Sequence, residues 1–186
     1  MLQVSTLFGI PRGFFIPYRY AAAVDTPAAY AALEPAFCAA IPAFQAHLAD
    51  AARRLDTFLA LRGPAPLPRF DQDWFPRLDA VAAYTMVASR RPARIVEVGS
   101  GHSTRFMARA IADSGLTTRF TAIDPAPRAP VRGLALDWHS STLHDAAPAL
   151  LTGLAAGDIL FVDSSHILMP GTDVRSEEHT SELQSR

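Results

Sequence analysis

One stretch, residues 95–104, constrains the fold of this chain more than any other. It reads Ile-Val-Glu-Val-Gly-Ser-Gly-His-Ser-Thr: an apolar run with one acidic residue, two glycines one residue apart, and a typical helix start. This pattern predicts a strand, a tight turn and a helix N-terminus, where open α/β sheets bind nucleotide-like ligands. A dinucleotide site favours Gly or Ala three residues after the second glycine, but this position is Thr104. Glu97 also suits a cationic ligand better than a diphosphate.

Two other motifs accompany this stretch. Asp163-Ser164-Ser165-His166 follows the apolar run 158–162, and residues 12–20 read Arg-Gly-Phe-Phe-Ile-Pro-Tyr-Arg-Tyr. With these motifs, and up to about Val174, the chain resembles class I S-adenosylmethionine-dependent methyltransferases, most of all a bacterial subgroup with EVGSGHST and DSSH motifs. The resemblance implies S-adenosylmethionine as the cofactor and a Rossmann-like α/β fold with the strand order 3-2-1-4-5-7-6.

The last residues, 175–186, differ sharply from the rest: alanine and proline disappear, and one leucine is the only apolar residue. The string matches the translation of a common sequencing-library adapter, so we expect an artefactual tail, with a genuine polar tail as the alternative. We therefore expect a chain truncated after its fourth strand, with a partial parallel sheet in the order 3-2-1-4. The expected domains are an N-terminal arm and helices over 1–70 (lid or dimer contact), a truncated cofactor-binding domain over 71–174, and the tail.

Composition excludes several classes of protein. The chain has 186 residues, a formal net charge of −1 at pH 7 and one cysteine. The near-neutral charge gives no support to nucleic acid or an anionic membrane as a partner. Cys38 alone excludes an intrachain disulfide and a Cys-rich zinc site, and we expect it to be buried in a helix. No apolar run approaches the roughly 20 residues that span a bilayer, and no signal peptide is evident, so the expected location is the cytoplasm.

The N-terminal part is predicted to be an arm followed by helices. Residues 1–26 combine aromatic residues with Gly and Pro, which suggests either a lid whose Arg12 and Arg19 touch an acidic substrate or an arm packed on the domain or on a second subunit. Helices are predicted over 27–40 and 42–62. The second carries an apolar stripe at helical spacing, interpreted as core or as contact in a homodimer. Its members are Phe44, Leu48, Leu55, Phe58 and Leu59.

From residue 74 the pattern alternates between helices and strands. A helix over 74–89, capped by Asp71 or Asp73, is expected to bury one face. That face is Leu78, Val81, Ala82, Thr85 and Met86. The following elements are strand 94–98, helix 103–114, strand 119–123, strand 134–138, helix 147–154 and strand 158–162. Such alternation implies a parallel sheet with right-handed crossovers.

Each part of the implied cofactor makes a different chemical demand. The glycines of the turn let the backbone approach the ligand, and free N–H groups at the helix start suit its carboxylate. Glu97 is expected to bind the amino group, directly or through water. Asp124 at the end of a strand suits the ribose hydroxyls, or it merely starts a turn. The resemblance gives Asp145 the adenine amino group, although it suits a helix cap equally well. The expected set is Glu97, Gly99, Ser100, Gly101, His102, Ser103, Asp124 and Asp145.

Asp163 and His166 are the expected catalytic residues. Asp163 ends the fourth strand beside the first and is expected to face the methyl group, while His166 is close enough to serve as a general base. A solvated surface histidine is the alternative. One Asp and one His make an incomplete metal site, so no metal ligand is assigned and metal dependence stays open. Trp74 and Phe75 border the adenosine pocket in one interpretation and belong to the core in the other.

Three functions compete on these grounds. The first is methyl transfer to oxygen or nitrogen of a small-molecule acceptor, where holding the nucleophile, methyl group and sulfur in line supplies much of the acceleration. The second is a nicotinamide-dependent oxidoreductase, against which Thr104 counts. The third is a non-catalytic fragment, whose unpaired fourth strand would be an association site. We expect the truncated chain itself to be inactive or aggregated, even if its parent gene encodes a methyltransferase.

Overall fold

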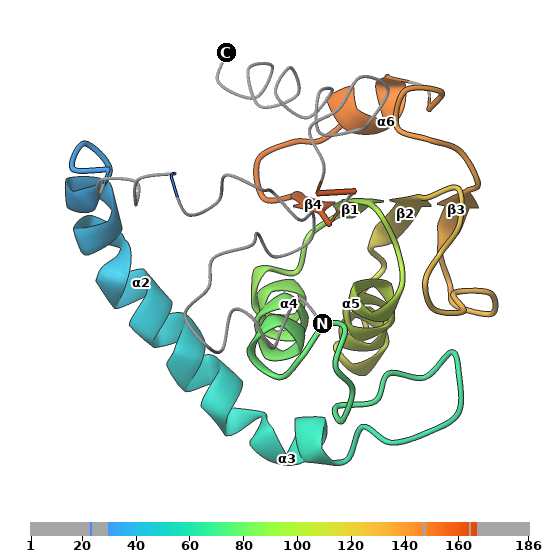
Figure 1. Cartoon of the computed structure of the whole chain (residues 1–186). Coiled ribbons are helices and arrows are strands. Elements are labelled where there is room, and N and C mark those ends of the chain that lie inside the picture. Colours follow the sequence, from blue (N-terminus) through green and yellow to red (C-terminus); the bar gives the residue numbers. More distant parts are fainter. Residues whose placement is uncertain (1–22, 24–29, 147, 164, 167–186) are drawn as a thin grey trace. The chain divides into compact units, whose positions relative to one another are not determined.

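A computed structural model of the chain describes Ala23 and residues 30–146, 148–163 and 165–166 (Figure 1). The chain divides into two compact units, Met1–Pro42 and Ala43–Arg186. The predicted arm with Arg12 and Arg19 and the predicted tail lie outside the described residues. The proposed domain boundaries near residues 70 and 174 stay predictions. No helix in the described ranges combines the length and the apolarity needed to cross a membrane.

The described part of the first unit is mainly the beginning of helix α2 (Glu34–Arg53). The prediction of a break before Pro42 is wrong, because α2 continues through this proline into the second unit. Proline removes one N–H donor from a helix, but its neighbours Ala39, Ala40 and Ala43 belong to the residue type with the highest helix propensity. The expectation for Cys38 is also wrong, since its side chain is exposed.

The second unit is built around a four-stranded parallel sheet. Its strands are β1 (Arg94–Val98), β2 (Arg119–Ile123), β3 (Asp137–His139) and β4 (Ile159–Val162), in the order β3-β2-β1-β4. In the centre of the sheet, Val96 of β1 pairs with Thr121 on one side and Leu160 on the other. β1 and β2 are buried along most of their length and are mainly apolar, with Glu97 and Thr121 as buried polar residues. The predicted Rossmann-like α/β class and the order 3-2-1-4 are confirmed.

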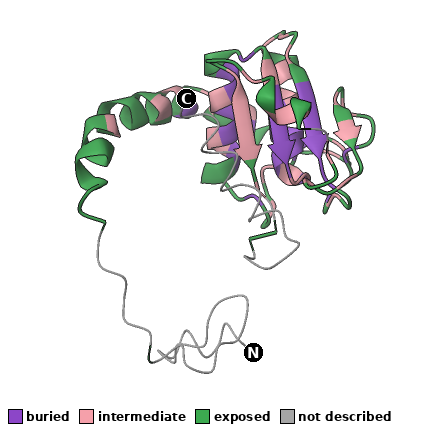
Figure 2. Cartoon of the chain, turned by 90° about the horizontal axis from the view of Figure 1, so that it is seen from above, coloured by how far each residue is buried: buried purple, intermediate pink, exposed green. Residues whose placement is uncertain are grey.

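Helices α4 (Leu78–Arg90) and α5 (His102–Asp113) lie side by side under the sheet in Figure 1, and the short α6 (Ala149–Thr152) lies on the opposite face. The core forms where α4 and α5 meet the strands, and Figure 2 shows its buried residues on the central strands. The largest fully buried apolar side chains are Phe58, Phe106, Phe120, Ile95, Met107 and Ile123. This packing fixes the carboxyl ends of β1, β2 and β4 at one edge of the unit.

Helix α5 ends as its sequence predicts. Gly115 follows the helix with a φ of 57°, a backbone conformation that glycine adopts without a steric penalty. The Leu116 N–H donates to the Ile111 carbonyl at 3.0 Å, and the Gly115 N–H donates to the Ala112 carbonyl at 3.1 Å. These two bonds form a Schellman motif, which satisfies carbonyl groups at the end of the helix.

Only one of the five residues of the predicted apolar stripe belongs to the core. Phe58 of α3 (Leu55–Leu59) is fully buried and meets the ring of Tyr84 edge-on at 5.1 Å. The other four members are about half exposed, so their assignment to the core is wrong; they are Phe44, Leu48, Leu55 and Leu59. A homodimer that covers these side chains stays a prediction, for which sedimentation equilibrium is the test.

Helix α4 starts four residues later than predicted. The side-chain oxygen of Gln72 accepts hydrogen bonds from the N–H groups of Trp74 and Phe75, at 2.9 Å each, which commits this segment to a turn. The N-cap is Arg77, without a side-chain cap, so the predicted caps Asp71 and Asp73 are not used. Within the predicted buried face, Thr85 is fully buried, whereas Leu78 in the first turn is 61% exposed.

Candidate active site

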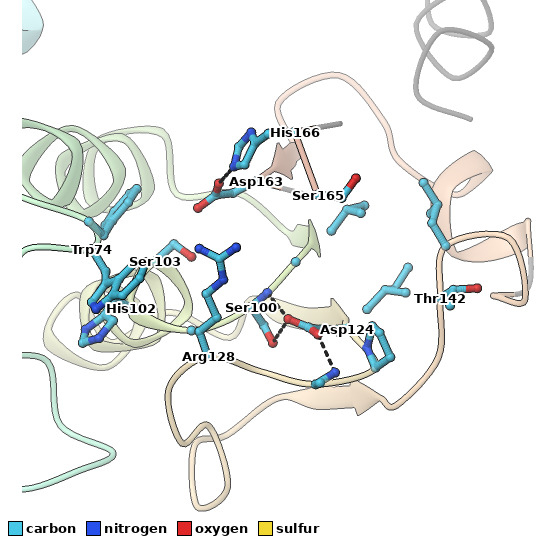
Figure 3. A pocket seen from close by; sticks show the side chains of 18 of the residues that line it. Trp74, Ser100, His102, Ser103, Asp124, Arg128, Thr142, Asp163, Ser165 and His166 are labelled. Atoms are coloured by element: carbon cyan, nitrogen blue, oxygen red, sulfur yellow. Dashed lines mark hydrogen bonds and ion pairs between the residues drawn. The ribbon is translucent and has the colours of Figure 1, made fainter. Parts of the chain in front are cut away.

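A pocket of about 360 Å³ opens at the carboxyl ends of β1, β2 and β4 (Figure 3). This is the edge at which open α/β sheets bind their ligands, and the volume lies within the range usual for small-molecule sites. Eight predicted site residues gather here: Gly99, Ser100, Gly101, His102, Ser103, Asp124, Asp163 and His166. Two predicted residues, Glu97 and Asp145, do not line the pocket.

The bend between β1 and α5 forms the floor of the pocket. Gly99 has a φ of 81°, and its N–H donates to the Ile123 carbonyl at 2.9 Å, which ties the bend to the end of β2. Only a residue without Cβ adopts this φ at low cost, so the backbone conformation of the bend explains why position 99 is glycine. Gly101 is the N-cap of α5, and the first N–H groups of the helix follow it.

Asp124 organises the wall beside this bend. Its Oδ2 accepts hydrogen bonds from the Ser100 N–H at 2.6 Å and from the Ser100 hydroxyl at 3.0 Å. Its Oδ1 accepts from the Ala126 N–H at 2.7 Å. The side chain lies at the pocket surface, and an ionised carboxylate has about four acceptor positions. Three are filled, so one is open to a ligand hydroxyl, and rotation of the Ser100 hydroxyl opens a second.

Glu97 lies beneath the bend and is fully buried. One carboxylate oxygen accepts from the Ser103 hydroxyl at 2.5 Å and the other from the Thr104 hydroxyl at 2.7 Å. Burial raises the pKa of Glu97 to about 8, although these two hydrogen bonds oppose the shift. Glu97 therefore joins β1 to the first turn of α5, and its predicted contact with the cofactor stays a prediction.

His102 begins α5 and lines the pocket. Its Nδ1 is buried and finds no hydrogen-bond partner in the described part of the chain. Burial lowers the pKa of His102, and the positive charges of Arg105 and Arg69 lower it further. The ring is therefore neutral near pH 7, and His102 adds no positive charge to the pocket.

Asp163 and His166 form a pair at the end of β4. The His166 Nε2 lies 2.9 Å from the Asp163 Oδ1, and both side chains are partly exposed at the pocket. His166 has a φ of 58°, and this left-handed backbone is part of the geometry that returns the imidazole to a residue three positions earlier. The Asp163 N–H donates to the Val98 carbonyl at 2.9 Å, which fixes the pair beside β1.

Asp145 lies outside the pocket lining. It is exposed, and its Oδ2 accepts from the Thr142 hydroxyl at 2.8 Å. It does not cap α6, whose N-cap is Pro148 without a side-chain bond, so the capping interpretation is wrong. Its predicted contact with adenine stays a prediction, while its neighbours Thr142, Leu143 and His144 line the pocket.

Sequence reasoning missed Arg128 and left Trp74 and Phe75 undecided between pocket and core. Trp74 and Phe75 line the pocket, and Phe75 also belongs to the core. Arg128 reaches the pocket from the loop after β2, four residues beyond Asp124 (Figure 3). Its place in this loop, close after the predicted ribose ligand, is the one signal in the sequence that could have indicated it. Within the described ranges, no group of three His, Cys, Asp or Glu side chains comes together as a metal site.

Residues 96–177 match a family model described as a methyltransferase domain. The match supports a methyltransferase. The matched segment contains the bend after β1, Asp124 and the Asp163–His166 pair, and thus most of the residues that line the pocket. Neither the curated proteins nor the solved structures contain a match to the chain.

Proposed function

We propose that the chain is an S-adenosylmethionine-dependent methyltransferase domain that acts on oxygen or nitrogen of a small molecule. One observation carries the proposal: Asp124 and the glycine bend after β1 share one pocket, within the segment that matches a methyltransferase domain. In this assignment the Asp124 carboxylate accepts from the ribose hydroxyls, and the first N–H groups of α5 bind the cofactor carboxylate.

The charge of the pocket lining supports this cofactor. The lining contains Asp124, Asp163 and Arg128, which leaves a formal charge of −1 when its histidines are neutral. A lining of this sign favours a sulfonium cation over a pyrophosphate. The cofactor supplies a methyl group activated by positive sulfur, and the residues of the pocket orient it.

Thr104 argues against a dinucleotide. Its Oγ1 accepts from the Gly101 N–H at 2.8 Å and donates to the Glu97 carboxylate at 2.7 Å. It occupies the position at which a dinucleotide site keeps a small residue for close approach of helix and strand. The two hydrogen bonds commit the side chain to the bend, which disfavours the oxidoreductase alternative.

Titration with S-adenosylhomocysteine (SAH) and with NAD separates these two functions. We expect SAH to bind and to raise the melting temperature of the protein, because a ligand that binds only the folded state stabilises it. NAD is expected to have no effect at the same concentration. Isothermal titration calorimetry and thermal denaturation are the measurements. Tight NAD binding without a response to SAH would reverse the assignment.

We assign proton removal from the acceptor to His166, oriented by Asp163. The Nε2–H of the imidazole donates to Asp163, which leaves Nδ1 to accept a proton from the attacking group. His166→Gln is expected to keep the affinity for SAH within about twofold and to lower methylation by about a hundredfold. A radiolabelled methyl donor with a panel of small phenols and amines measures this loss. A chain that binds SAH and methylates no acceptor would favour the non-catalytic alternative.

A further inference from the structure

Arg128 is the one arginine among the described residues that line the pocket. Its guanidinium carbon lies 5.4 Å from the centre of the Trp74 ring, at cation–π distance. Trp74 and Arg128 come from segments on either side of β1 and β2 in the sequence, so the fold brings them together at the pocket.

The N–H groups of the Arg128 guanidinium are available to a ligand. No described carboxylate lies within ion-pair distance of it, and no described residue accepts a hydrogen bond from it. Contact with an aromatic face leaves the N–H groups in the plane of the guanidinium available, and this planar fork matches a carboxylate in a two-point contact. Both residues are exposed, and the contact with Trp74 leaves the guanidinium donors of Arg128 unused.

The remaining charges limit the kind of anion that fits. Asp124 and Asp163 line the same pocket, so one cation faces two carboxylates. A ligand with several negative charges meets stronger repulsion there than a ligand with a single carboxylate, and a positive charge on the same ligand offsets the repulsion.

We propose that Arg128, supported by Trp74, is the binding subsite for one carboxylate of a ligand in this pocket. The proposal rests on the proposed function and adds a specificity determinant to it. The carboxylate comes either from the amino-acid part of the cofactor or from a methyl acceptor that is itself a carboxylic acid. In the second case the first N–H groups of α5 serve the cofactor and Arg128 selects acidic acceptors.

Arg132 offers a matched control for the test. Its guanidinium carbon lies 5.7 Å from the centre of the Trp138 ring, a similar arrangement, but neither residue lines the pocket. The variants are Arg128→Gln, Arg128→Lys and Arg132→Gln, each checked for an unchanged melting temperature. The probes are SAH, 5′-methylthioadenosine (which lacks the amino-acid part), and benzoate with neutral benzamide, titrated by calorimetry with and without SAH.

Two results support the subsite and identify its source. If Arg128→Gln weakens SAH about tenfold and leaves 5′-methylthioadenosine unchanged, the carboxylate is that of the cofactor. If SAH is unchanged and benzoate, but not benzamide, loses about tenfold in affinity, the carboxylate is that of the acceptor. Arg128→Lys keeps the charge without the fork and is expected to give an intermediate loss.

Other results overturn the proposal. It fails if Arg128→Gln leaves SAH and benzoate binding unchanged, if wild-type protein binds neither probe, or if Arg132→Gln gives the same loss. Failure of the proposed function is distinct, because then wild-type protein does not bind SAH, while the comparison of benzoate between wild type and Arg128→Gln still decides the subsite.

Discussion

Replacing Asp124 with alanine is expected to abolish measurable SAH binding, the largest effect on ligand affinity that we predict. The proposed contact gives two charge-assisted hydrogen bonds to the ribose, each worth roughly 1.5–3 kcal/mol, so their loss weakens binding by a factor on the order of 100 or more. The Ser100 and Ala126 N–H groups also lose their acceptor in this variant. The bend that carries the cofactor would therefore shift as well.

Two further variants separate binding from folding. Asp124→Asn keeps the volume and one oxygen, so it is expected to fold better than Asp124→Ala and still to bind SAH weakly. Asp56→Ala removes an exposed carboxylate of α3 that does not line the pocket, and is expected to leave SAH affinity nearly unchanged. Calorimetric titration and thermal denaturation of all three variants are the measurements. An Asp124→Ala protein that is folded and binds SAH within threefold of wild type would contradict the assignment to the ribose.

The strands that carry this site were predictable because their burial follows directly from local sequence. Strands β1 and β2 begin and end at the predicted residues, since a short, mainly apolar segment bounded by turn residues is enough to indicate a buried parallel strand. Gly115 likewise marks the end of α5 by its own conformational freedom. Where one residue decides the local backbone, sequence reasoning succeeded.

The errors arise where several segments decide together. The exposed members of the stripe, such as Phe44, have the spacing of a core face, but burial depends on what packs against a helix. The start of α4 depends on the side chain of Gln72, which binds two backbone N–H groups of a turn. Arg128 lines the pocket because of the conformation of the loop after β2, and the periodicity of a sequence does not predict loop conformations.

Glu97 carries the second large prediction, a change in stability with pH. Its pKa is raised to about 8 in the folded protein, against an ordinary value of 4.5. Below the ordinary value the carboxyl is protonated in both states; between the two values it is ionised only in the unfolded chain. The stability that its protonated form contributes is therefore lost as the pH rises through this window, by about 1.4 kcal/mol per pH unit at most.

Glu97→Gln is expected to remove this dependence, because the amide stays neutral and the hydroxyls of Ser103 and Thr104 rotate to pair with it. From pH 5 to pH 8, the unfolding free energy of wild type should fall relative to the variant by an amount on the order of 4 kcal/mol. Glu34→Gln, at an exposed position in the first turn of α2, is the control and should follow wild type. Urea denaturation at several pH values measures the difference, and parallel curves for wild type and Glu97→Gln would contradict it.

Proton release on SAH binding distinguishes two roles of Glu97, contact with the cofactor amino group and a purely structural link between β1 and α5. If the cofactor amino group approaches Glu97, its positive charge favours the ionised form, and SAH binding near pH 7 releases up to about one proton. If Glu97 only joins β1 to α5 through Ser103 and Thr104, it keeps its proton and binding releases none. Calorimetry of SAH binding in buffers of different ionisation enthalpy measures the release, with Glu97→Gln as the reference. Equal proton release by wild type and variant would exclude contact with the amino group and leave Glu97 a structural residue of the bend.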